Sequence, residues 1–314
     1  MKTGHSRLNT AVLAILCCLL WSSAFAGIKI GLHYTTPLQF AGIRFFLAGL
    51  LVFPLAYRKA PHYFQVFRSN VKLMLLLAFL QTFLQYTLFY LGIALIPGAV
   101  AAIVIGAQPL FVALIAHFFA PGDRLNWKKT AVIFSGILGV VLVSLGRDPG
   151  SLSGRIAPLG ILLILAVNLQ SGAANVLVAG RGKTVPPLVI SSSSMIMGGA
   201  GLFILSLFVE GYHPGPKPAD YYLSLAWLSM LSAVSISIWI TLLKRPGTKV
   251  SDLNLWKFLI PVAGAILSWL LIPEEKAQFL SIVGMFVIAM SLVFLNILNR
   301  RSQRPVSASP PQSS

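Results

Sequence analysis

The chain has 314 residues, of which 57% are hydrophobic and only 10% are charged, and its mean hydropathy is +0.84. Soluble domains carry about 25% charged residues, so this composition excludes an ordinary soluble protein. The 24 Lys and Arg outnumber the 7 Asp and Glu, which gives a net charge of +17. Such an excess can indicate a nucleic-acid partner. In a membrane protein it can instead reflect the gathering of Lys and Arg on the cytoplasmic side, so the positions of the basic residues decide between the two.

Ten apolar runs follow one another along the chain, each long enough to cross a bilayer as a helix. They cover roughly residues 9–31, 37–57, 71–95, 98–119, 128–146, 157–180, 187–209, 220–243, 248–272 and 277–298. The runs lack the alternation of a membrane β-barrel. We therefore expect an all-α membrane protein with ten transmembrane helices.

The first run allows two interpretations. Lys2 and Arg7, followed by an apolar stretch and the small-residue sequence at 24–26, imitate a cleavable signal peptide. However, the apolar run continues to Leu32, and the internal repeat described below requires this helix. A retained first span is the favoured interpretation.

The basic residues gather on one side of the predicted spans. With a cytoplasmic N-terminus, 17 of the 24 lie in cytoplasmic segments, 4 lie on the opposite side, and Lys29, Arg44 and Lys257 fall within spans. This bias predicts that both termini are cytoplasmic. The charge excess is therefore topological: the expected partner is the lipid bilayer, and nucleic-acid binding is not expected.

Metal and disulfide chemistry has little support in the sequence. The two cysteines, Cys17 and Cys18, are adjacent in an apolar run, which excludes a disulfide scaffold and a cysteine-based zinc site. The five His residues are scattered without metal-ligand spacing. We expect neither a metal nor a cofactor.

Proline, glycine and acidic residues recur at a nearly constant spacing. Three pairs are 152 residues apart: Pro109 with Pro261, Pro121 with Pro273, and Asp123 with Glu275. Two further pairs are 150 residues apart: Pro37 with Pro187, and Gly49 with Gly199. Each half contains five spans, so the second half enters the membrane inverted. This is the design of secondary transporters, whose site lies between the halves near the membrane centre. We expect repeats at 1–152 and 153–298, followed by a disordered cytoplasmic tail at 299–314.

Several short motifs add a family resemblance. They are Trp21-Ser22-Ser23-Ala24-Phe25, Pro37 with Arg44-Phe45-Phe46-Leu47-Ala48, Gln108-Pro109-Leu110-Phe111-Val112-Ala113-Leu114, Ile260-Pro261-Val262-Ala263-Gly264-Ala265 and Pro273-Glu274-Glu275. In this order the motifs resemble the EamA branch of the drug/metabolite transporter superfamily over about residues 9–298. The one departure is Val132, where the family usually has Gly. The resemblance implies an inner-membrane carrier of two repeats, with a central cavity lined mainly by helices 1, 3, 4, 6, 8 and 9.

Lys257 is the leading candidate for a substrate contact. It lies about nine residues into the ninth span, roughly 13 Å deep at 1.5 Å per residue. It also comes one turn before Pro261, and a proline interrupts helical hydrogen bonding. A buried ammonium would favour a carboxylate, a phosphate or a polar oxygen of a substrate. The alternative is a lysine that extends to the cytoplasmic edge of the membrane.

Three residues are candidates for gating rather than binding. Pro109 and Pro261 are expected hinges in the fourth and ninth spans. Arg44 lies about seven residues into the second span, and its counterpart in the family it resembles is also Arg. That resemblance implies a structural or gating partner for Arg44.

The third span carries four candidate ligand-binding side chains. Gln81 and Gln85 are four residues apart, as are Tyr86 and Tyr90, so each pair shares a face of an α-helix. Amides and phenols suit the orientation of a small polar or aromatic ligand. Hydrogen bonding between neighbouring helices would explain the same residues equally well.

The other polar and aromatic candidates are spread over four spans. They are Trp21, Asn168, Asn175, Ser237, Trp239 and Trp256. Each is expected either to line the cavity or to pack between helices, and the sequence leaves both alternatives open.

The absence of an acid deep in any span argues against an exporter of lipophilic cations. We expect instead a secondary carrier for a small polar, zwitterionic or anionic metabolite, such as an amino acid, acting as exporter or exchanger by alternating access. A channel or a lipid scramblase-like pore is the alternative. An intramembrane enzyme is not expected, because the sequence lacks a nucleophile motif, a metalloprotease motif, a P-loop and a deep carboxylate pair.

Overall fold

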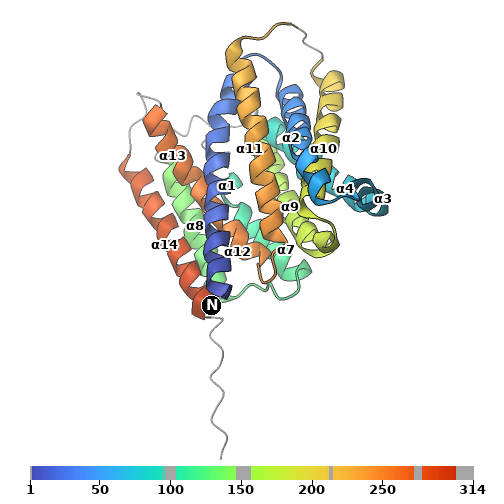
Figure 1. The fold of residues 1–314 in the computed structure, drawn as a ribbon. Helices are drawn as coiled ribbons and strands as arrows, with labels where there is room; N and C mark the ends of the chain where they lie inside the picture. Colours follow the sequence, from blue (N-terminus) through green and yellow to red (C-terminus); the bar gives the residue numbers. More distant parts are fainter. Residues whose placement is uncertain are drawn as a thin grey trace, which may run out of the picture.

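The computed structural model describes residues 2–93, 95, 104–145, 157–211, 215–271 and 278–301. Regular structure within these ranges is entirely helical (Figure 1). The first half contains α1 (Lys2–Leu32), α2 (Pro37–Lys59), α3 (Tyr63–Ser69), α4 (Val71–Ala78), η1 (Phe79–Leu84), α5 (Gln85–Ile93), α7 (Gln108–Phe119) and α8 (Trp127–Leu145). The second half contains α9 (Ala157–Gly180), η2 (Arg181–Thr184), α10 (Pro187–Val209), α11 (Ala219–Leu243), α12 (Val250–Leu255), η3 (Trp256–Phe258), α13 (Leu259–Leu271) and α14 (Phe279–Arg301).

Helices lie over each of the predicted apolar runs. Five helical segments of the described chain are long and apolar enough to cross a membrane, namely those at 37–59, 71–93, 158–180, 187–209 and 219–243. The short helix α3 was not predicted, and α14 continues through Arg301 into the segment expected to be a tail. Residues 302–314 of that tail, and the motif at 273–275, lie outside the described residues.

Two helices of corresponding position begin in the same way. Pro37 and Pro187 stand in the first turn of α2 and α10, after residues with extended backbone angles (Thr36, φ −78° and ψ 153°; Pro186, φ −56° and ψ 136°). Proline is favoured there because an N–H in the first turn has no acceptor within the helix, so its absence costs no hydrogen bond, and because the fixed φ of proline is already helical.

The most extensive helix contacts follow a two-fold relation between the halves, so that each of them is either between corresponding helices or has an equivalent in which the two halves are swapped. The second helices of the halves, α2 and α10, contact each other, as do the fifth helices, α8 and α14. The contact of α1 with α11 matches that of α9 with α5, and the contact of α1 with α13 matches that of α9 with α7. The start of α1 and the end of α14 lie at the same end of the bundle (Figure 1).

Glycine permits the closest of these crossings. A Cβ on Gly199 of α10 would lie 2.4 Å from the Phe46 amide nitrogen, and one on Gly49 of α2 would lie 2.7 Å from the Ile196 amide nitrogen. Phe46 and Ile196 are separated by the same 150 residues as the two glycines. The repeat in the sequence is thus a repeat of helix contacts.

The outer surface is apolar, as a lipid environment requires. Large side chains such as Phe208, Phe279 and Leu270 are 84%, 81% and 75% exposed. Polar side chains are instead buried between the helices, among them Asn168 and Asn254, each with no exposed surface. Polar groups that face the interior of a membrane bundle commonly mark a functional path.

Candidate functional site

Two helical segments at predicted spans are interrupted at corresponding places. The segment of α12 and α13 passes through the 3₁₀ turn η3, and Pro261 is the third residue of α13. The segment that ends in α7 is helical at 104–106, breaks at Ala107, and resumes with Pro109 as the second residue of α7. Both predicted hinge prolines therefore stand in the first turn after a break. Interrupted helices of this kind form the binding sites of many secondary transporters.

Lys257 lies within the η3 break and points into the bundle. Its Nζ donates a hydrogen bond to Gln108 Oε1 at 2.8 Å, from one break to the other. The same Nζ lies 4.9 Å from the Trp239 ring centroid and 5.5 Å from the Trp21 ring centroid. The two indole rings form an edge-to-face pair with centroids 5.0 Å apart. Side chains of α1, α7 and α11 thus surround the ammonium, which does not extend toward a membrane edge.

The charge of Lys257 has no acidic partner among the described residues, where the ion pairs join Lys129 to Asp123 and to Asp252. A lysine ammonium has three donor hydrogens, and the Gln108 amide oxygen takes one. Two cation–π contacts within about 6 Å stabilise the charge further without neutralising it. The arrangement can therefore accept an anionic group.

Neighbouring helices hold both breaks through symmetric contacts. Cys18 Sγ of α1 donates to the Trp256 carbonyl at 3.2 Å, and Asn168 Nδ2 of α9 donates to the Val104 carbonyl at 2.6 Å. Cys18 and Asn168 are 150 residues apart, and Val104 and Trp256 are 152 apart. The Val104 carbonyl also accepts the Ala107 backbone N–H at 3.2 Å, and the Trp256 carbonyl accepts the Leu259 backbone N–H, so each side chain adds a second hydrogen bond at its break. Of the two alternatives for Asn168, lining the cavity or packing between helices, this hydrogen bond corresponds to the second.

Asn175 makes a second contact between helices. Its Nδ2 donates to Asn254 Oδ1 at 3.0 Å, and Asn254 Nδ2 donates to the Val250 carbonyl. This places Asn175 in a buried amide pair between α9 and α12. Ser237 is buried on α11, and its hydroxyl has no partner among the described residues. Trp256 is partly buried and packs with apolar side chains at the break.

The third-span candidates form a separate cluster on α2 and α5. The Tyr86 ring packs on Phe45 with centroids 4.1 Å apart, and the Arg44 guanidinium carbon lies 4.4 Å from the Phe45 centroid and 5.5 Å from that of Tyr86. Arg44 is only 3% exposed, and its Nε and Nη1 have no hydrogen-bond partner among the described residues. The Tyr90 hydroxyl is likewise buried and has no hydrogen-bond partner among the residues that the structure describes.

The prediction that Gln81 and Gln85 follow α-helical spacing is wrong. Residues 79–84 form a π-helix, whose turns are wider than those of an α-helix, and Gln81 lies inside it. Gln81 Oε1 is buried and accepts no hydrogen bond from any described residue, while Gln85 begins α5 and is partly buried. The local sequence gives no signal for the inserted residue, because the apolar and polar side chains of 79–87 would fit an α-helix as well.

A charged cluster joins the halves at the end of the bundle where α7 ends and α12 begins. Asp123 Oδ1 accepts a hydrogen bond from Lys129 Nζ at 2.7 Å, and its Oδ2 accepts one from the Ser251 backbone N–H at 2.8 Å. Lys129 Nζ also lies 2.7 Å from Asp252 Oδ1. Burial alone would raise the pKa of Asp123, but Lys129 and Ser251 together hold that pKa below its ordinary value. The Asp123 carboxylate is therefore charged at neutral pH.

A family model for EamA-like transporters matches this chain at residues 8–145 and again at 158–297. The chain belongs to the EamA-like transporter family. This confirms the resemblance predicted from the motifs, and the two matches correspond to the two halves that pack against each other in the bundle.

Relatives of this EamA-like transporter extend over nearly its whole length. A probable amino-acid metabolite efflux pump of Escherichia coli K12 is 31% identical and covers 94% of this chain and 97% of its own. A transporter of S-adenosylmethionine and S-adenosylhomocysteine from Chlamydia muridarum is 25% identical, with 90% of each chain covered. An uncharacterized inner membrane transporter, YedA of E. coli K12, is 25% identical over 88% of each chain.

A solved crystal structure shares the fold. Its TM-score is 0.81, with 18% identity and coverage of 94% of this chain and 99% of the other. Together with the apolar helices, the relatives confirm the expected multi-pass transporter of the inner membrane. Among the residues described, no group of three His, Cys, Asp or Glu is placed to hold a metal ion.

One residue at the Lys257 site was not predicted, namely Gln108. Gln108 immediately precedes Pro109, so a polar residue at the start of an interrupted helix was the available signal. Trp239 is two residues from Ser237 on α11, which places the two on different faces of that helix. Of the predicted set, the structure brings together Lys257, Trp21 and Trp239, with Pro109 and Pro261 beside the breaks.

Proposed function

We propose that this EamA-like transporter is a secondary carrier that moves a small polar, zwitterionic or anionic metabolite by alternating access, as an exporter or exchanger. The observation that supports it most directly is the Lys257 ammonium at the meeting of two helix breaks, with the neutral Gln108 as its only hydrogen-bond acceptor among the described residues. A substrate carboxylate can replace that acceptor and gain a charge-assisted bond.

The proposed topology has ten spans with both termini in the cytoplasm. The 17-to-4 distribution of basic residues supports this orientation, and so does the placement of the start of α1 and the end of α14 at one end of the bundle (Figure 1). The Asp123 cluster then lies on the cytoplasmic side, where it links the α7–α8 connection of the first half to α12 of the second.

The proposed cycle uses these features in turn. The substrate binds between Lys257 and the indoles of Trp21 and Trp239, which offer apolar surface beside the charge. The halves then rock around this site, as in other carriers built from inverted repeats. Because the cluster of Asp123, Lys129 and Ser251 bridges the halves, it closes the cytoplasmic side and must separate for the site to open there.

The proposed substrate class is supported by the charge of Lys257 and by the name of a relative. A lysine without an acid selects an anionic or zwitterionic group over a cation. A relative named as a probable amino-acid metabolite efflux pump favours an amino acid or a derivative, whose carboxylate would meet Lys257.

The test uses purified protein in liposomes. A thermal-shift screen with amino acids, nucleosides and organic anions identifies a ligand, because binding to the folded state raises the midpoint. Uptake of that ligand, radiolabelled, is then measured into empty and preloaded vesicles. Faster uptake into preloaded vesicles indicates a carrier; high flux without such acceleration would indicate a pore instead.

Lys257 variants test the site itself. After correct insertion is verified, Lys257→Ala should reduce affinity at least about tenfold, since it removes a charge-assisted bond of ~1.5–3 kcal/mol. Lys257→Arg should retain part of the activity. Lys128→Ala is the matched control, because Lys128 is exposed and its Nζ lies 5.9 Å from the centroid of the neighbouring Trp127 ring. Normal transport by both Lys257 variants would show that Lys257 does not anchor the substrate.

A further inference from the structure

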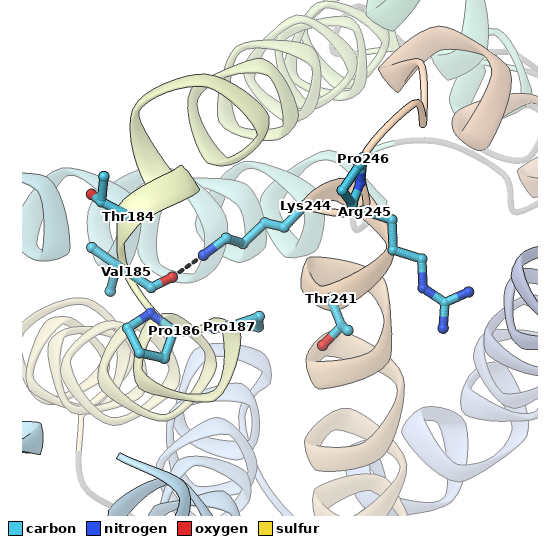
Figure 2. Close-up of a pocket in the computed structure, with 8 residues that line it drawn as sticks. All are labelled: Thr184, Val185, Pro186, Pro187, Thr241, Lys244, Arg245 and Pro246. Atoms are coloured by element: carbon cyan, nitrogen blue, oxygen red, sulfur yellow. Dashed lines mark hydrogen bonds between the residues drawn. The ribbon is translucent and has the colours of Figure 1, made fainter. Parts of the chain in front are cut away.

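A cavity of about 410 Å³ lies in the second half, away from Lys257, between the connection of α9 to α10 and the end of α11 (Figure 2). The residues that line it are Thr184, Val185, Pro186, Pro187, Thr241, Lys244, Arg245 and Pro246. None of them takes part in the Lys257 site or in the Asp123 cluster, so the transport proposal does not use this cavity.

Lys244 crosses the cavity. Its Nζ donates to the Val185 carbonyl, which ties the end of α11 to the segment after η2 (Figure 2). The Arg245 side chain points the other way in the same view, and its Nη1 donates to Thr10 Oγ1 of α1 at 2.8 Å. A single carbonyl leaves two of the three Lys244 donors for another acceptor.

The charge of the cavity is not balanced. The connections at 181–186 and 244–249 contain Arg181, Lys183, Lys244, Arg245 and Lys249 and no acidic residue. Within the described part of the chain Lys244 has no carboxylate at ion-pair distance, and Asp252, the next acid along the sequence, pairs with Lys129. Burial lowers the pKa of Lys244 to about 8, which reflects an ammonium without a counter-ion.

The depth of the cavity matches the lipid headgroups. Two of its lining residues, Pro187 and Thr241, lie at or near the ends of helices that are apolar enough to span the membrane, Pro187–Val209 and Ala219–Leu243. Lys244 is the first residue beyond α11. The membrane–water boundary therefore passes through this level, and under the proposed topology it faces the cytoplasmic leaflet, where basic pockets between helices bind anionic headgroups.

We propose that this cavity binds the phosphate of an anionic phospholipid headgroup, with Lys244 as the principal contact. The headgroup supplies the missing negative charge and joins the α9–α10 connection to the end of α11. A lipid rather than a free phosphate is the occupant, because the cavity opens at the boundary where lipid phosphates are concentrated and its walls continue into apolar helix surfaces.

The experiment measures thermal midpoints of the full chain in a neutral detergent. Dioctanoyl phosphatidylglycerol, dioctanoyl phosphatidylcholine and inorganic phosphate are titrated separately. We expect phosphatidylglycerol alone to raise the midpoint in a saturable way. In Lys244→Gln the apparent Kd for phosphatidylglycerol should rise about fivefold, the effect of one basic residue near an anionic surface. Lys244→Arg should respond like the wild type.

Two further variants separate a site from general attraction. Lys128→Gln removes one charge from an exposed residue outside the cavity and should leave the response intact. Thr241→Phe fills the cavity without altering charge and should abolish the response, which tests the proposal even if Lys244→Gln fails to fold. An equal shift with inorganic phosphate, an equal shift with phosphatidylcholine, or an unchanged response in Thr241→Phe would each overturn the proposal. Transport activity is not the readout, so failure here leaves the carrier proposal unaffected.

Discussion

In the proposed carrier, the contact of Lys257 with Gln108 is suited to exchange with a substrate. The neutral amide stabilises the ammonium in the empty carrier, but it does so with a bond weaker than a carboxylate would make. The Trp21 and Trp239 rings hold the ammonium in position from two sides, so a substrate does not have to order the side chain on arrival. A permanent acid at position 108 would remove this advantage.

Gln108→Glu should therefore lower the affinity for an anionic substrate. The new carboxylate would pair with Lys257 and compete with the substrate, and we expect about a tenfold rise in Kd, or ~1.4 kcal/mol. Gln108→Leu is the comparison: it removes the acceptor without adding a charge, so affinity should hold while the thermal midpoint falls. Both are measured by ligand-induced thermal shift. Equal affinities in wild type and Gln108→Glu would contradict the proposed role of Lys257.

At the scale of elements, the repeat determines which helices can approach each other. The sequence predicted the positions of the helices well because a bilayer demands long apolar runs, and α10 occupies the predicted residues 187–209. The sequence did not predict the π-helix at 79–84 or the partner Gln108, because such features depend on neighbours from distant segments and leave no periodicity in the local sequence.

The crossing of α2 and α10 gives a direct test of the two-fold packing. Gly199→Ala places a Cβ 2.4 Å from the Phe46 amide nitrogen, so the helices must move apart. Overpacking costs ~1–3 kcal/mol, and we expect the thermal midpoint to fall by about 3 °C or more. Gly49→Ala should act similarly because it meets Ile196 in the equivalent way. Gly264→Ala is the control, since among the described residues no atom of another helix lies within 4 Å of its Cβ position. A midpoint unchanged in both crossing variants would contradict this packing.

At the scale of the whole molecule, the two ends of the bundle are built differently. Asp123 has its sequence counterpart in Glu275, but at the offset of 152 the other cluster members Lys129, Ser251 and Asp252 correspond to Ser281, Ala99 and Val100. The full set of charges therefore belongs to one end, which is cytoplasmic in the proposed topology. The proposed carrier would therefore close its cytoplasmic side through ion pairs and hydrogen bonds for which the repeat supplies no equivalent set of residues at the other end.

Breaking the cluster should shift the carrier toward a state open to the cytoplasm. Removing one partner of a buried ion pair costs ~3–5 kcal/mol, and carrier states differ by only a few kcal/mol. We expect Asp123→Asn to add a longer component to the distance distribution between spin labels at positions 124 and 249, which are exposed on the two halves. The labels are introduced after Cys17→Ser and Cys18→Ser and are read by double electron–electron resonance.

The pH dependence of this closure follows from the sign of the Asp123 shift. In the folded protein the pKa of Asp123 lies below the ordinary aspartate value of about 3.9. The carboxylate therefore stabilises the closed end at any pH above about 3.9, and it loses this effect only as the pH falls through the lowered pKa. The distances in the wild type should therefore be constant between about pH 5.5 and pH 8. Lys128→Gln, which alters an exposed charge at the same end, should leave them unchanged as well. If Asp123→Asn gave the wild-type distribution, the charged cluster would not hold the halves together, and closure would have to come from the apolar contacts around it.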